Sequence, residues 1–213
     1  MVPPDRIIPV AEQTGVIQKL THWVLETALQ QQLRWRKAGS DIIVAVNLST
    51  HDLLDASLPD TVSELLAETA TPPDKLTLEI TESAMMSDPE TALRVLTRLH
   101  EMGVTLSIDD FGTGYSSLAY LQKLPVSELK IDRSFVQHMA DRPQDRKIVR
   151  SIIDLAHNLD MRVVAEGIED ERSLDMLVSM GCDYGQGFYI ARPMPAAQLK
   201  GWLQQAPWRK PAA

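Results

Sequence analysis

Short apolar runs alternate along the chain with longer segments in which apolar residues recur every three or four positions. The short runs are rich in β-branched residues and have the length of strands. Several are apolar at consecutive positions, which is typical of strands covered on both faces in a parallel sheet. The six expected strands span residues 42–49, 75–82, 104–110, 128–132, 162–167 and 184–190.

Amphipathic helices are predicted between the strands, over residues 17–38, 88–103, 145–161, 170–182 and 195–205. The second of these has clear boundary signals. Asp88 suits the N-cap, Pro89 suits the first helical position, and Gly103 suits the stop. The third is expected to bury one apolar face, formed by Ile148, Ile152, Leu155 and Leu159.

The alternation of strands and helices predicts an α/β fold with right-handed crossover connections. An open doubly wound sheet and a (β/α) barrel both fit this order. The 213 residues are enough for one domain with a buried core. No fixed-period repeat or linker interrupts the pattern, so residues 1–213 are interpreted as a single domain.

Composition narrows the classes of partner. The net charge of −8 argues against a protein that binds DNA or RNA polymers, because such proteins need a basic face, but it allows a small anionic ligand held through metal ions. Cys182 is the one cysteine, so no intrachain disulfide can form, and a cytoplasmic location is expected. The sequence shows neither a signal peptide nor an apolar stretch of about 20 residues that would span a membrane.

Polar residues gather where the apolar runs end. In a parallel barrel, the carboxyl ends of the strands converge on the face that carries the active site. The residues at the predicted strand ends are therefore expected to meet there. They are Asn47, Ser49, Glu79, Glu82, Asp109, Asp110, Lys130, Glu166 and Gln186.

Carboxylate and amide oxygens of this kind favour Mg²⁺ or Mn²⁺. The adjacent Asp109 and Asp110 suit a pair of cations, the arrangement used in phosphoryl transfer, while Lys130 and Glu166 suit the orientation or deprotonation of a water molecule. Taken singly, each residue has a plainer interpretation as a helix cap, a turn or a solvated side chain. The Asp-Phe-Gly string does not indicate a protein kinase, because the glycine-rich loop and the His-Arg-Asp loop are missing.

Five ordered motifs give the chain a resemblance to a known family. They are "NLS", "LEITES", "IDDFGTGYSSLAYLQKLPVSELKIDRSFV", "VVAEGIED" and "GCDYGQGFYIARPMP". The sequence resembles the EAL-domain family, from about Pro3 to Leu199. The resemblance implies a TIM-like barrel and a metal-dependent phosphodiesterase that hydrolyses cyclic-di-GMP to linear pGpG in bacterial signalling.

The resemblance also assigns roles to particular residues. It implies Mg²⁺ or Mn²⁺ bound by Asn47, Glu79, Asp109 and Asp110, and it matches Lys130 and Glu166 to catalytic positions. Substrate contacts are expected from Gln186, Ser49 and Arg192. Glu82 is expected to support the following loop, "FGTGYSSL", which in the family couples homodimer formation to activity.

One family feature is not matched. The Glu-Ala-Leu motif, whose glutamate is a metal ligand in the family, does not occur in the sequence. About six of eight barrel strands are therefore expected, the first two being absent. A fragment of a longer protein and a short protein completed by a partner both fit this observation. An active enzyme and a catalytically impaired module that binds cyclic-di-GMP or a partner protein remain alternatives.

Overall fold

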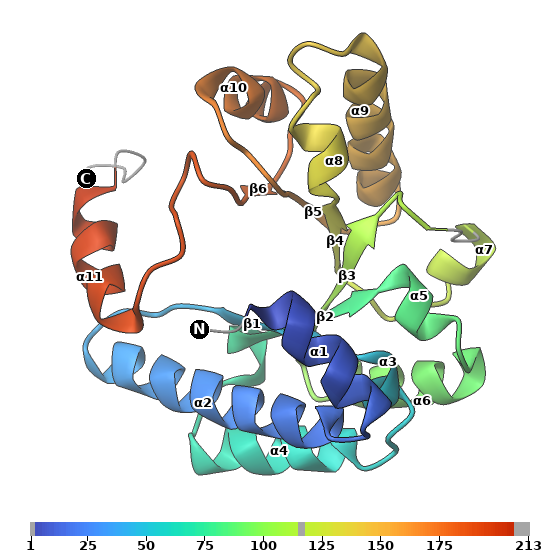
Figure 1. Ribbon diagram of the computed structural model, residues 1–213, viewed down its shortest axis with the longest axis vertical. Helices are drawn as coiled ribbons and strands as arrows, with labels where there is room; N and C mark the ends of the chain where they lie inside the picture. The colour runs from blue at the N-terminus through green and yellow to red at the C-terminus, as the bar shows by residue number, and fades with distance from the viewer. Residues whose placement is uncertain (1–2, 115–117, 207–213) are drawn as a thin grey trace.

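The computed structural model of the protein describes residues 3–114 and 118–206. Helices and strands alternate along most of its length (Figure 1). In chain order they are α1 (Pro4–Gln13), α2 (Ile17–Lys37), β1 (Val44–Leu48), α3 (Thr50–Leu53), α4 (Leu58–Glu68), η1 (Pro73–Lys75), β2 (Leu76–Thr81), α5 (Glu82–Met85), α6 (Pro89–Glu101), β3 (Thr105–Phe111), α7 (Leu118–Leu121), β4 (Glu128–Ile131), α8 (Arg133–Val136), α9 (Pro143–Asn158), β5 (Arg162–Ala165), α10 (Glu171–Ser179), β6 (Tyr184–Gly185) and α11 (Ala196–Gln205).

The sheet of the described residues has six parallel strands in the order β1-β2-β3-β4-β5-β6. Strands that are consecutive in the sequence are also neighbours in the sheet, so the order never reverses. A doubly wound sheet needs such a reversal, and the structure therefore excludes it. The strands follow a curved path with helices around the convex side (Figure 1). The fold is a curled half-barrel, which confirms the prediction of an incomplete TIM-like barrel.

The two faces of the sheet differ sharply in polarity. In β2, Leu76, Leu78 and Ile80 are fully buried under the helices, while Thr77 and Glu79 alternate with them on the concave face. The same alternation recurs in β3 and β4. The side chains of these strands alternate in polarity, but residues of both faces are mostly buried, as expected for strands covered on both faces. Their concave face carries polar and charged side chains, and this face holds the candidate site.

Helix boundaries follow the signals in the sequence. The Asp88 side chain accepts a hydrogen bond from the backbone N–H of Thr91 (3.2 Å), and Gly103 has the positive φ (+87°) of a residue that follows a helix. In α9 the predicted face is displaced by one position. Its fully covered residues are Val149, Ile152, Ile153 and Ala156, whereas Ile148, Leu155 and Leu159 are half-buried.

The sixth strand is much shorter than expected, because the chain leaves the sheet after Gly185. It crosses over Ile168, whose backbone N–H donates to the carbonyl of Gln186 (3.1 Å) and whose carbonyl accepts from the N–H of Tyr189 (3.0 Å). A Cβ atom at Gly187 would lie 2.1 Å from that carbonyl oxygen, so only glycine permits this crossing. The crossing directs residues 186–193 toward the mouth of the half-barrel.

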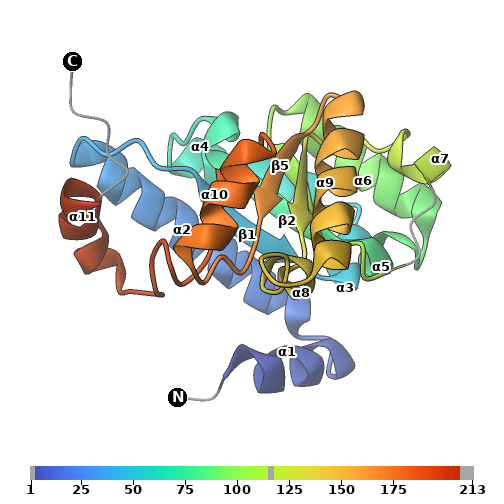
Figure 2. The same cartoon turned by 90° about the horizontal axis from the view of Figure 1, so that it is seen from above.

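Helices α1 and α11 lie at the margins of the fold. Helix α1 protrudes from the rest of the protein, as Figure 2 shows. Helix α11 has no fully buried residue, and the indole N–H of Trp35 donates to the carbonyl of Ala196 at its start (3.4 Å). Over the described residues, no helix combines the length and apolar character that a bilayer crossing requires.

Candidate active site

Lys130 lies at the centre of the concave face and binds three carboxylates. Its Nζ is 2.9 Å from Glu79 Oε1 and 2.9 Å from Asp109 Oδ1. A third ion pair joins it to Glu166 Oε1 at 2.7 Å. The four side chains come from the C-terminal parts of β2, β3 and β4 and from the residue after β5. Only 4% of the lysine side chain is exposed, so this is a desolvated charge cluster rather than a surface salt bridge.

A β-bulge explains how Asp109 and Asp110 both reach this face. Neighbouring strand residues normally point to opposite faces of a sheet. Here Ile108 pairs with Leu129 and Phe111 with Ile131, so three steps along β3 match two along β4. Within this bulge Asp110 has a left-handed backbone conformation, with φ +54°. As a result, ligand oxygens of Asp109, Asp110 and Glu166 lie within 4.8 Å of one another.

The electrostatics of the cluster reflect burial and crowding. Burial raises the pKa of both Glu79 and Glu166, although the Lys130 ammonium acts against this. The pKa of Asp110 rises to about 6, first because of burial and then because of the neighbouring Asp109 charge. Burial would lower the pKa of Lys130, but the surrounding carboxylates outweigh it and raise that pKa, so Lys130 stays an ammonium.

Asp132 belongs to this site although the sequence analysis did not select it. Its carboxylate is hydrogen-bonded to that of Asp110. It also caps α8, accepting from the backbone N–H of Ser134 (3.0 Å). Burial would raise the pKa of Asp132, but hydrogen bonds from the side chain and backbone of Ser134 act against it, and that pKa lies below its usual range. Asp132 could have been selected from the sequence, because it directly follows β4 and lies two residues after Lys130.

Asn47 and Ser49 lie at the end of β1, beside the cluster. Asn47 pairs with Glu79 in the strand register and is exposed. Ser49 forms a reciprocal capping box with Asp52: the Ser49 hydroxyl accepts from the backbone N–H of Asp52 (3.3 Å), and the Asp52 carboxylate accepts from the backbone N–H of Ser49 (2.7 Å). The structure thus brings Asn47 next to a carboxylate of the cluster, whereas it gives Ser49 a local structural partner.

Glu82 lies outside the cluster, under the loop that follows β3. Strand β2 ends at Thr81, so Glu82 opens α5 and points away from Glu79. Its Oε1 accepts a hydrogen bond from the backbone N–H of Gly112 (3.4 Å). The role of Glu82 in supporting this loop stays a prediction from the sequence. Tyr115–Ser117 of that loop lie outside the described residues.

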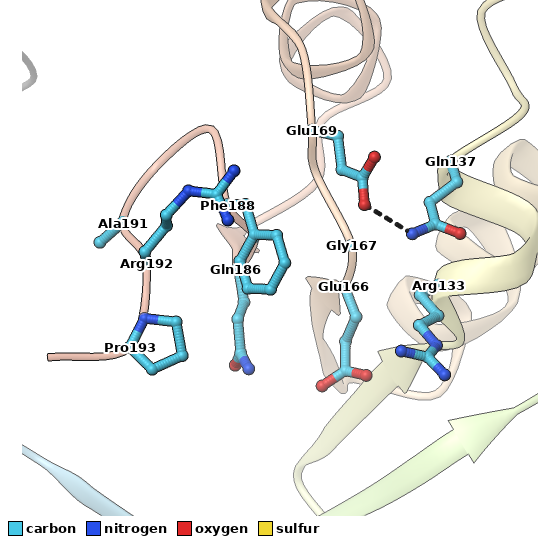
Figure 3. A pocket seen from close by; sticks show the side chains of 11 residues that line it. Arg133, Gln137, Glu166, Gly167, Glu169, Gln186, Phe188, Ala191, Arg192 and Pro193 are labelled. Atoms are coloured by element: carbon cyan, nitrogen blue, oxygen red, sulfur yellow. Dashed lines mark hydrogen bonds between the residues drawn. The ribbon is translucent and has the colours of Figure 1, made fainter.

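A pocket of about 410 Å³ adjoins the cluster on the side of β5 and β6. Gln186 and Arg192 line it, together with Glu166 at its edge (Figure 3). The Arg192 guanidinium lies 4.8 Å from the centre of the Phe188 ring, a cation–π contact. Phe188 and the pair in which Gln137 donates to Glu169 (2.8 Å) were not predicted from the sequence. In the sequence, Phe188 could have been noticed as an aromatic residue directly after Gly185 and Gly187.

The residues of the cluster fit a hard divalent cation. Several carboxylate oxygens converge on one small volume, and that volume already attracts a cation, the Lys130 ammonium. Carboxylate-rich sites of this kind suit Mg²⁺ or Mn²⁺ better than zinc, which prefers cysteine and histidine. The chemistry of the donor set therefore agrees with a metal site at the ends of β2–β5.

An α/β half-barrel with an acidic cluster at the carboxyl ends of its strands has that cluster where barrel folds carry their active sites. Residues 1–193 match the EAL domain. The chain belongs to the EAL-domain family.

Two curated relatives and one solved structure illustrate the similarity. The bifunctional diguanylate cyclase/cyclic di-GMP phosphodiesterase MucR of Pseudomonas aeruginosa is 45% identical over 200 residues, which is 93% of this chain and 29% of MucR. The cyclic di-GMP phosphodiesterase NbdA of the same organism is 43% identical over 202 residues, 94% of this chain and 26% of NbdA. The chain thus spans between a quarter and a third of their length. The MucR phosphodiesterase in complex with c-di-GMP has a TM-score of 0.88 at 45% identity, covering 93% of this chain and 81% of that one.

Proposed function

We propose that this domain hydrolyses one phosphodiester bond of cyclic-di-GMP to give linear pGpG, with Mg²⁺ or Mn²⁺ as cofactor, in bacterial second-messenger signalling. The observation that carries the proposal is the convergence of Glu79, Asp109 and Glu166 on Lys130 beside the pocket that Gln186 and Arg192 line. Membership of the EAL family, with relatives named as cyclic di-GMP phosphodiesterases, supports the choice of substrate.

Asn47, Glu79, Asp109 and Asp110 are the residues that would hold the metal ions. Asp132 joins them because its carboxylate is hydrogen-bonded to Asp110. A bound Mg²⁺ or Mn²⁺ supplies Lewis-acid character and neutralises charge on the phosphodiester. The sheet and Lys130 hold the carboxylates that face one another in position before a metal ion binds.

Glu166 and Lys130 would act on the reacting groups. Water attacks phosphorus, a new P–O bond forms, and the P–O3′ bond breaks. The departing 3′-oxygen takes up a proton from solvent, which leaves a 5′-phosphate and a 3′-hydroxyl. Glu166, whose pKa burial raises, would accept the proton of the attacking water. Lys130 keeps its positive charge and would stabilise the negative charge that develops on the phosphoryl oxygens.

The pocket beside Glu166 would hold one nucleotide of the substrate. The ring of Phe188 is 52% exposed and offers a surface for stacking a purine base. Arg192 lies over the same ring, and its guanidinium is placed to pair with a phosphate. Gln186 lines the same pocket and would donate to or accept from the base or ribose. Ser49, at the end of β1, would contact the substrate from the opposite side.

We also propose that the protein is a cytoplasmic homodimer. Half-buried apolar residues of α9, Ile148 and Leu155, line a surface groove together with Ile152. The ring of Phe135 and Ile152 lie under Gly112, in the loop that the sequence analysis links to dimer formation. Sedimentation velocity checks this part of the proposal: a single monomeric species at micromolar concentration would reject it.

Hydrolysis of cyclic-di-GMP by the purified protein, in the presence of Mn²⁺ or Mg²⁺, tests the function. The Asp109→Asn variant removes one carboxylate of the cluster and is expected to lose at least about 100-fold in kcat. Asp41→Asn is the matched control, because Asp41 is exposed and forms its ion pair with Lys75 and not with the cluster. Equal turnover by wild type and Asp109→Asn would refute the assignment of the site. Binding of cyclic-di-GMP without any turnover would identify a binding module instead of an enzyme.

A further inference from the structure

The Lys130 ammonium lies where three carboxylates converge, in the kind of environment that a metal ion requires. Its distances to Glu79, Asp109 and Glu166 are all between 2.7 and 2.9 Å. The carboxylate side chains are 12–16% exposed, so water screens these charges poorly. Lys130 thus acts as a resident cation of the site.

Asp110 differs from these three carboxylates. It shares a volume with Asp109 and Glu166, but its hydrogen-bond partner is Asp132 and not Lys130. The acidic residues therefore form two lobes that share Asp109 and Glu166. The lysine lobe contains Glu79 and Lys130, and the open lobe contains Asp110 and Asp132.

We propose that Lys130 makes the two lobes unequal in cation affinity: the first divalent ion binds in the open lobe, and the second must displace the Lys130 ammonium from Glu79. This inference rests on the proposed metal dependence. A divalent ion and an ammonium repel each other strongly when both lie against the same desolvated carboxylate. The lysine therefore preserves the geometry of the site before metal binding and weakens the second cation position.

Calorimetric titration of the full chain with Mn²⁺ at about pH 8 tests the inference, above the ordinary pKa of every carboxylate. Wild type is expected to show two binding steps whose Kd values differ by about tenfold or more. In Lys130→Met, which keeps an unbranched side chain one atom shorter and removes its charge, the weaker step is expected to tighten by at least about tenfold. Lys75→Met is the matched control, because it removes an ammonium that pairs with the exposed Asp41.

The outcomes separate this inference from the proposed function. Wild type that binds no Mn²⁺ would refute the metal site itself. Wild type that binds Mn²⁺, beside a Lys130→Met protein whose weaker step is unchanged or weaker still, would refute only the role of Lys130. Lys130→Arg keeps the charge and is expected to retain the weak step.

A measurement on the wild-type protein covers the case in which Lys130→Met fails to fold. The side-chain NH₃⁺ signal of Lys130 can be followed by NMR during titration with Mg²⁺, which is diamagnetic. The signal is expected to shift a little during the tight step, because the first ion shares Asp109 and Glu166 with the ammonium. It should move further during the weak step, as the ammonium leaves Glu79. A signal that stays in place through saturation of both steps would overturn the inference.

Discussion

Glu82 and Gly114 are in such close contact that no side chain fits between them. A Cβ atom at Gly114 would lie 2.3 Å from Oε2 of Glu82. The other oxygen of the same carboxylate accepts a hydrogen bond from the N–H of Gly112. Glu82 therefore fixes the loop at two points directly after Asp110, so displacement of this carboxylate should also disturb the metal site.

Gly114→Ala should destabilise the protein by about 1–3 kcal/mol, because the methyl group pushes the Glu82 carboxylate away from Gly112. Urea unfolding measures the change. Gly201→Ala is the control, since this glycine lies within α11 and nothing lies within 4 Å of its added Cβ. That control should gain stability, by about 0.5–1 kcal/mol. A Gly114→Ala protein as stable as wild type would contradict the close contact.

Glu166→Gln should lower kcat for cyclic-di-GMP by about 10²–10⁴-fold and change KM little, because an amide cannot accept the proton of the attacking water. The amide oxygen can still accept from Lys130, so the local geometry should survive. Steady-state kinetics measure both constants, with Glu171→Gln on the exposed start of α10 as the control. A kcat close to that of wild type would assign the proton transfer to another group.

The metal-free protein should lose stability as pH rises through the titration range of Asp110. The pKa of Asp110 in the fold is about 6, above the ordinary value of 3.8, so the folded state holds this proton more tightly than the unfolded state. The resulting stabilisation is complete below about pH 4 and is lost by about pH 6 to 7. Asp110→Asn cannot ionise and should lack this loss. Urea unfolding in EDTA across that range compares the two proteins.

The stability of Asp110→Asn relative to wild type should therefore rise with pH. Asp141→Asn, at a residue whose side chain is 84% exposed, controls for the loss of a surface carboxylate. A difference between wild type and Asp110→Asn that stays constant with pH would show that Asp110 ionises in the folded protein as it does in the unfolded chain.

Arg192→Ala should raise KM for cyclic-di-GMP by about tenfold or more, because a charge-assisted contact to phosphate is lost. The effect on kcat should be smaller, since Arg192 lies beside Phe188 and away from the Lys130 cluster. Arg192→Lys keeps the charge but loses the planar stacking surface, so its KM should be intermediate. Arg172→Ala, at an exposed ion pair with Asp141, is the control. An unchanged KM would remove Arg192 from the substrate site.

Much of the fold was predictable because its signals are local. All six strands were expected, and Asp88 and Gly103 mark the ends of α6 as predicted. The short end of β6 was not predictable, because the chain leaves the sheet through a contact between Gly187 and the distant Ile168. Helices α1 and α4 were missed as well. Pro4 and Pro59 stand in their first turns, and each was available as a signal for a helix start.

The site was predictable in its chemistry more than in its geometry. A cluster of acidic residues around a lysine follows from polar residues at successive strand ends. The sequence alone does not show that three carboxylates share the Lys130 ammonium, because that depends on the register of β2, β3 and β4. The hydrogen bond between Asp110 and Asp132 depends on the β-bulge in β3, and this bulge cannot be predicted from a single sequence.

The charge cluster around Lys130 has a consequence for folding. Four consecutive strands each contribute one charged side chain at or beside their carboxyl end. Each of these side chains lies on the concave face only when the strands have their native register. A slip of one residue in any of these strands would turn its charge toward the apolar helical layer. The cluster therefore disfavours sheets with misaligned strands, because each of them would bury an unpaired charge. A protein in which the cluster has formed has its strands in the correct register.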